Sequence, residues 1–159
     1  PEMNNVLLSG GDPMVLKTEK LHRIMDHLLA CPNLTSIRFG TKAIAFYPPR
    51  FADAELPGLF QRIMAAGKAP VIVGHFDHYG EISEEAIQNI RKLRAIGVQF
   101  LNQSVLLGGV NDDPDTIAET FRRCHEIGSR PYYLFWGGPL GAPLTFRFRS
   151  AVASKSCVA

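Results

Sequence analysis

The sequence lacks any long hydrophobic segment: no apolar run in its 159 residues approaches the roughly 20 residues that a membrane-spanning helix requires. It also lacks an excess of charge of one sign, and its net charge of +2 does not indicate nucleic-acid binding. The first residues carry no secretory signal pattern. These absences predict a cytoplasmic protein with neither a membrane nor a nucleic acid among its partners.

Cysteine is scarce. The three cysteines, Cys31, Cys124 and Cys157, are far apart in the sequence and odd in number. They therefore indicate neither a disulfide framework nor a Cys-x-x-Cys metal site. Free thiols in a reducing compartment are the expected state of these side chains.

What is present is a regular alternation of apolar strands and amphipathic helices. The units repeat at roughly 30 residues, which predicts parallel β/α units with right-handed crossovers. The first strand is an unbroken apolar run and is expected to be buried on both faces. Five strands are expected at residues 6–8, 34–39, 70–74, 98–107 and 130–135, four helices at residues 17–30, 54–66, 83–96 and 113–128, and a loop at residues 43–51.

Both a doubly wound sheet and a (β/α)₈ barrel fit this alternation. Polar residues follow nearly every strand, as at the active face of a barrel. The predicted fold class is therefore α/β, with residues 1–135 forming part of a TIM-type barrel. Residues 136–159 contain no acidic residue and show no clear periodicity, so they are expected to be an irregular, basic tail or the product of a shifted reading frame. Because the chain opens at Pro1 and reaches its first strand almost at once, we expect it to be a piece of a longer protein.

A glycine turn follows the first strand. Ser9, Gly10, Gly11 and Asp12 come directly after the apolar run. Glycine lets the backbone turn sharply and lets a ligand approach it closely. Exposed amides in such a turn can hold an amino-acid-like or phosphate-like group, and Asp12 could accept a hydrogen bond from an ammonium or a ribose. The alternative is an ordinary turn between a strand and a helix.

The third strand ends in His75-Phe76-Asp77-His78. Two imidazoles and a carboxylate at a strand end could bind a divalent metal ion, which would suit a metal-dependent hydrolase. In an extended chain His75 and Asp77 share a face, whereas His78 need not join them. A third or fourth ligand on that face is not evident, so a hydrogen-bonding role for His75, with His78 solvated, is the simpler interpretation.

Two further groups of polar residues invite a functional interpretation. Asn102, Gln103 and Ser104 interrupt an apolar strand, and they need either a ligand or neighbouring backbone and water as partners. Three cations lie near the end of the second strand, where they could bind an anion or remain solvated: Arg38, Lys42 and Arg50.

Taken together, these motifs resemble the lysine 2,3-aminomutase family of radical S-adenosylmethionine enzymes. The resemblance covers about residues 5–135. It is carried by LLSGGD (7–12), IRFGTK (37–42), PR (49–50), HFDH (75–78), NQSVLLGGVND (102–112) and RPYY (130–133).

The resemblance implies a partial or full β/α barrel, S-adenosylmethionine, a [4Fe–4S] cluster and pyridoxal phosphate. It implies that an amino group moves between adjacent carbons of lysine or a related amino acid through a 5′-deoxyadenosyl radical. It is compatible with a homo-oligomer of the full-length protein, and with a relative that modifies a lysyl group on a protein. By motif match, the S-adenosylmethionine contacts are Ser9, Gly10, Gly11, Asp12, Lys42, His75 and Gln103, with Lys42 standing where the family usually has arginine.

Three features of the family are missing. The cluster-binding Cys-x-x-x-Cys-x-x-Cys motif is absent, Lys155 does not sit in the context of the pyridoxal lysine, and Trp136-Gly137-Gly138 replaces a polar residue followed by Cys-Asp. This chain alone is therefore expected to carry no catalytic or metal-ligating residue and to be inactive. A non-catalytic module that keeps an S-adenosylmethionine groove is a further alternative.

Overall fold

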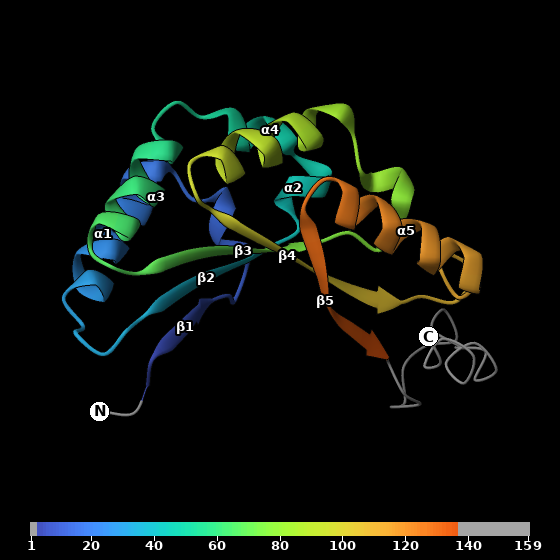
Figure 1. Cartoon of the computed structure of the whole chain (residues 1–159), viewed down its shortest axis with the longest axis horizontal. Coiled ribbons are helices and arrows are strands. Elements are labelled where there is room, and N and C mark those ends of the chain that lie inside the picture. Colours follow the sequence, from blue (N-terminus) through green and yellow to red (C-terminus); the bar gives the residue numbers. More distant parts are fainter. Residues whose placement is uncertain (1–2, 137–159) are drawn as a thin grey trace.

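A computed structural model describes residues 3–136, in which all five strands form one parallel sheet (Figure 1). The strands lie in the order in which they occur in the sequence, and each pairs in parallel with the next. A doubly wound sheet reverses its strand order, whereas a β/α barrel does not. The fold is thus α/β and consistent with part of a barrel. The strands are β1 (Asn5–Leu8), β2 (Ser36–Thr41), β3 (Ala69–His75), β4 (Gln99–Leu106) and β5 (Ser129–Trp136).

Five α-helices connect the described strands, one more than the sequence predicted. They are α1 (Thr18–Leu29), α2 (Ala43–Phe46), α3 (Leu56–Ala65), α4 (Glu84–Ala95) and α5 (Pro114–Glu126). The expectation of a loop at residues 43–51 was wrong, because α2 and a 3₁₀ helix, Pro48–Ala52, occupy most of it. The two prolines do not prevent either helix, since Pro48 and Pro49 begin the 3₁₀ helix, where proline is tolerated.

The core lies between the sheet and the helices, which all cover the same face of the sheet (Figure 1). Alternate strand residues point into it, so β2 buries Ile37 and Phe39 while Ser36 and Arg38 are only half-buried. Phe39 packs edge-to-face on Phe60 of α3, with ring centroids 5.6 Å apart. This one-sided burial fixes which residues of each strand belong to the core.

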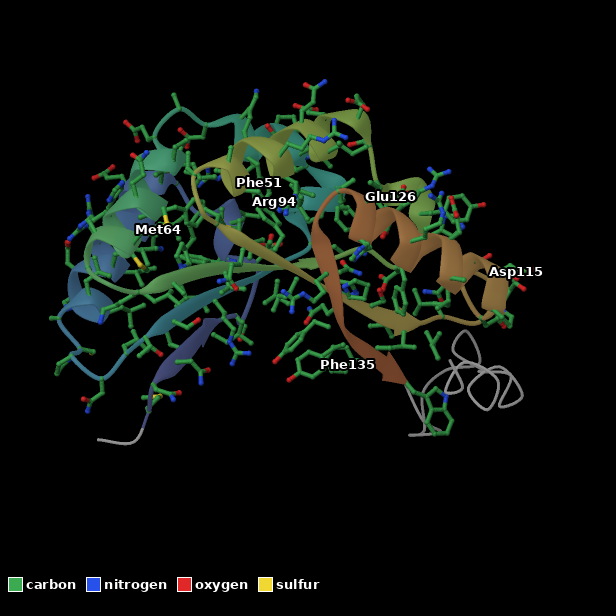
Figure 2. The ribbon with its side chains drawn as sticks, viewed as in Figure 1. Phe51, Met64, Arg94, Asp115, Glu126 and Phe135 are labelled. Atoms are coloured by element: carbon green, nitrogen blue, oxygen red, sulfur yellow. The ribbon has the colours of Figure 1, made fainter. Side chains whose placement is uncertain are left out.

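The opposite face of the sheet, here called the open face, is uncovered in the described part of the chain. Phe135 of β5 is 46% exposed there, on the side of the sheet away from the helices (Figure 2). Leu7 of β1 is 45% exposed, so the expectation that the first strand is buried on both faces was wrong. The apolar run correctly predicts a strand, but helices bury only Val6 and Leu8 in part.

The irregular tail expected at residues 136–159 lies outside the described residues except for Trp136, the last residue of β5. None of the described helices is long and apolar enough to cross a membrane.

Candidate functional site

The carboxyl ends of the strands place most of the predicted site residues along one edge of the sheet, here called the rim. The Ser9–Asp12 segment follows β1, Lys42 follows β2, and His75 ends β3. Gln103 of β4 pairs in register with His75. The rim of a parallel sheet is where β/α folds bind ligands.

The turn after β1 presents open backbone. Ser9, Gly10 and Gly11 are all exposed. The two glycines have φ angles of +87° and +94°, a region that other residues rarely adopt. A Cβ atom added to either glycine would meet nothing within 4 Å. The turn therefore has both the conformation and the space for a ligand to reach its peptide groups.

Asp12 organises the next loop of the rim. Its Oδ2 accepts hydrogen bonds from the Thr41 hydroxyl at 2.8 Å, from Lys42 N at 2.8 Å and from Ala43 N at 2.9 Å. Its Oδ1 accepts from Met14 N at 2.9 Å. The N–H groups of Lys42 and Ala43 lie at the N-terminus of α2, so the carboxylate also lies at the start of that helix. Asp12 thus joins the β1 turn to the start of α2.

Lys42 lies between two carboxylates. Its Nζ is 2.9 Å from Asp77 Oδ2 and 3.0 Å from Glu81 Oε1, and it donates to the His75 carbonyl at 3.2 Å. Its charge is therefore already paired within the described chain. The anion-binding role considered for this cation receives no support from the arrangement.

Asp77 contacts two other predicted site residues of the rim, His75 and Lys42. Its Oδ1 accepts from His75 Nε2 at 2.9 Å and from Val105 N at 2.7 Å, while its Oδ2 accepts from Lys42. Burial alone would raise the pKa of Asp77, but the hydrogen bonds from His75, Val105 and Lys42 lower this pKa to about 2. The carboxylate is ionised at neutral pH.

His78 does not join His75 and Asp77. Its Nδ1 accepts a hydrogen bond from Gly80 N at 3.0 Å, and its ring stacks on Tyr79 with centroids 4.0 Å apart. No group of three His, Cys, Asp or Glu side chains placed to hold a metal ion occurs within residues 3–136. The His75, Asp77 and His78 set proposed for a hydrolase is thus not assembled.

Asn102 and Ser104 point to the helix side of β4 and are fully buried. Asn102 exchanges two hydrogen bonds with the backbone of Phe76, at 2.9 and 3.1 Å, and Ser104 Oγ donates to the Phe76 carbonyl at 2.6 Å. Neighbouring backbone, one of the two alternatives considered, supplies their partners. Gln103 lies on the open face instead, and among residues 3–136 its side chain makes no hydrogen bond.

The two remaining cations are separated from Lys42. Arg50 braces the loop before α1 by donating to the carbonyls of Met14 and Leu16 and to Thr18 Oγ1, at 2.7, 2.9 and 2.9 Å. Arg38 donates to Asn5 Oδ1 at 2.6 Å on the open face. The three cations therefore do not form one anion site.

Sequence reasoning missed two residues that hold the rim together. Glu81 accepts from Asp77 N at 2.6 Å in addition to its ion pair with Lys42. Asn111 donates to the carbonyls of Asp77 and Val105 at 2.7 and 2.9 Å. The spacing of Glu81 three residues after His78 is a capping-box pattern and could have drawn attention to it.

The described residues do not supply the ligands of an iron–sulfur cluster. Cys31 is exposed after α1, whereas Cys124 is buried in α5, where burial raises the pKa of its thiol to about 12. Two cysteines on separate elements, one after α1 and one in α5, cannot replace a three-cysteine motif. The rim combines open backbone at Gly10 and Gly11 with the polar side chains of His75 and Gln103.

Curated relatives match most of this chain. A protein of Aquifex aeolicus, provisionally named L-lysine 2,3-aminomutase, is 37% identical over 137 residues, which are 85% of this chain and 37% of the relative. L-lysine 2,3-aminomutase of Escherichia coli is 34% identical over 134 residues, 84% of this chain and 38% of the relative. Glutamate 2,3-aminomutase of Clostridioides difficile is 32% identical over 134 residues, 84% of this chain and 31% of the relative.

No protein-family model matches the chain. The chain spans a little over a third of the length of the Aquifex and Escherichia relatives. Within that part, the sequence identity and the names of the relatives agree with the motifs along the rim. This chain belongs to the lysine 2,3-aminomutase family.

Proposed function

We propose that the rim binds S-adenosylmethionine and that the chain is part of a radical S-adenosylmethionine amino-acid 2,3-aminomutase. Relatives named for aminomutases support the reaction class, an isomerisation that moves an amino group. The observation that carries the proposal is the shared rim: the open Gly10–Gly11 turn, His75 and Gln103 all lie at the carboxyl edge of one parallel sheet.

Different residues of the rim contact different parts of the cofactor. Ser9, Gly10 and Gly11 offer backbone groups to the methionyl end, which carries a carboxylate and an amino group. Asp12 holds the turn in place, and its Oδ1, which accepts one hydrogen bond from the described chain, is the atom left for the cofactor's amino group. His75 and Gln103 lie against the rest of the cofactor, and Lys42 acts beside them through its contacts to Asp77 and Glu81.

The proposed enzyme also uses two cofactors that the described residues do not hold. A [4Fe–4S] cluster and pyridoxal phosphate would supply the radical chemistry and hold the amino acid when bound. We place the cluster cysteines and the pyridoxal lysine outside this chain, and we expect the chain alone to be inactive. The two relatives named for lysine and for glutamate both act, by name, on an amino acid, so an amino acid is the proposed substrate class.

Calorimetric titration of the whole 159-residue chain with S-adenosylmethionine tests the proposal. Gln103→Ala should weaken binding by about fivefold, the equivalent of one hydrogen bond. Gln99→Ala is a matched control, because Gln99 is the same residue type on the same strand and face and begins β4, away from the rim. Equal effects of the two changes, or no binding by a folded chain, would overturn the assignment of this rim.

A further inference from the structure

The contact between His75 and Asp77 decides which ring nitrogen of His75 carries a proton. The two atoms, His75 Nε2 and Asp77 Oδ1, are 2.9 Å apart. An ionised carboxylate has no proton and only accepts hydrogen bonds. The hydrogen in this contact must therefore come from the ring, which places it on Nε2.

The second ring nitrogen is then free to meet a ligand. In the neutral ring with a proton on Nε2, Nδ1 is a hydrogen-bond acceptor. No other described residue bonds to Nδ1, and the side chain is 21% exposed. His75 thus presents an acceptor at the rim next to Gln103, its partner in the sheet register.

Asp77 is held too firmly to serve as a ligand itself. Its side chain is 9% exposed, and both of its oxygens accept hydrogen bonds from the chain. Its backbone is fixed as well, since its N–H donates to Glu81 and its carbonyl accepts from Asn111. Because Asp77 is buried and already bonded to its neighbours, its carboxylate is placed to orient them.

We propose that Asp77 is a positioning residue that fixes the proton of His75 on Nε2, and that His75 Nδ1 consequently recognises a ligand hydroxyl or amine. The same carboxylate, together with Glu81, anchors the Lys42 ammonium beside the ring. The position of the proton on His75 does not depend on the proposed function. The identity of the ligand does rest on it: S-adenosylmethionine, which carries both hydroxyl and amine groups.

Nitrogen-15 NMR of the histidine rings in the ligand-free chain tests the first part. At pH 8, the neutral form of His75 in the unmodified chain should carry its proton on Nε2, and its signals are assigned by their loss in His75→Gln. Asp77→Ala should narrow the separation between the two ring nitrogen signals and lose the Nε2–H peak to exchange with water. Asp113→Ala is the matched control, because Asp113 is an aspartate that caps helix α5 and its side chain bonds to Thr116, not to His75.

Asp77→Asn separates the two roles of the carboxylate. Its amide oxygen can still accept from His75, so the proton should stay on Nε2, whereas its amide group no longer attracts the Lys42 ammonium. This variant also keeps the test informative if Asp77→Ala does not fold. A His75 ring with its proton on Nδ1 in the unmodified chain, or an unchanged ring in a folded Asp77→Ala chain, would overturn the proposal.

Binding of S-adenosylmethionine tests the second part. Asp77→Ala and His75→Ala should each weaken binding by about fivefold. The double variant should lose less than the sum of the two effects, because Asp77 acts in part through His75. Fully additive losses would contradict a positioning role. If the unmodified chain binds no S-adenosylmethionine, the proposed function fails while the NMR result still decides the role of Asp77.

Discussion

Asp12 and Asp77 stand on the same rim, but they hold different kinds of partner. Asp12 accepts hydrogen bonds from three backbone N–H groups and one hydroxyl, all of them neutral donors. Asp77 accepts from one backbone N–H, one imidazole and one ammonium. The first carboxylate therefore shapes the backbone of two loops, whereas the second orients two side chains that face the candidate site.

Substitution of the two aspartates should therefore have different effects. Removing Asp12 would leave backbone groups without an acceptor, which destabilises the fold. Removing Asp77 would release His75 and Lys42, which changes the site as well as the stability. Four changes test this difference, and they are given in decreasing order of their expected effect on stability.

Asp12→Ala should destabilise the chain by about 3 kcal/mol, because four donors lose a charged acceptor at a partly buried position. Urea unfolding followed by circular dichroism measures this loss. Asp12→Asn, which keeps an acceptor oxygen, should lose less. A loss below about 1 kcal/mol for the alanine variant would mean that water replaces the carboxylate and that the loop does not depend on it.

Acid should reveal the contribution of Asp77. Because its pKa is lowered to about 2 in the folded chain, its stabilisation is present above its ordinary pKa near 4 and disappears as the pH falls toward 2. The shift corresponds to about 2 kcal/mol. Urea unfolding between pH 5 and pH 2 measures the free energy of unfolding of the unmodified chain and of Asp77→Asn. The difference between the two chains should shrink by that amount as the pH falls. A constant difference would argue against an ionised, bonded Asp77.

Gly10→Ala tests the turn that Asp12 holds. Gly10 has a φ of +87°, and a Cβ atom there would meet nothing within 4 Å. The cost should therefore come from backbone conformation alone, at about 1 kcal/mol. Gly58→Ala in helix α3 is the control, since Gly58 also has open space but no positive φ, and it should be neutral or stabilising. Thermal unfolding of both variants compares them, and equal losses would contradict a strained turn.

Glu81→Gln should have the smallest effect, at about 0.5 kcal/mol or less. Its ion pair with Lys42 is partly exposed, with both side chains about one-third accessible, and such pairs contribute little. The glutamine oxygen can still accept from Asp77 N. Urea unfolding at low salt measures this effect. Glu81 belongs to the network around Asp77, so a loss of stability as large as that of Asp12→Ala would show that this network and the Asp12 network contribute to stability alike.

The sequence predicted most of the elements because each carries its own local pattern. Helices α1, α4 and α5 begin and end within about two residues of their expected bounds, since caps, prolines and glycines mark them. The prediction failed at α2, whose four residues are too short for a helical period to show. It also failed for the exposure of Leu7, because an apolar run predicts a strand without telling which face is covered.

The candidate site was predicted as a set of residues but not as a network. The sequence pointed to Asp12, Lys42, His75 and Gln103 through their motifs, and it gave no reason to join Lys42 to Asp77 or Asp77 to Val105. Asn102, Gln103 and Ser104 looked like one polar block. The alternation of a strand sends the outer two into the core and Gln103 to the open face.

The alternation of strands and helices, and the positions where strands end, can be predicted from local sequence, because they follow from hydrophobic periodicity and from turn residues close together in the chain. The contacts of Asp77 with Lys42, 35 residues away, and with Val105, 28 residues away, become visible in the three-dimensional fold. Parallel pairing brings distant strand ends to one rim, and the hydrogen bonds made there depend on sheet register and burial, which local sequence does not encode.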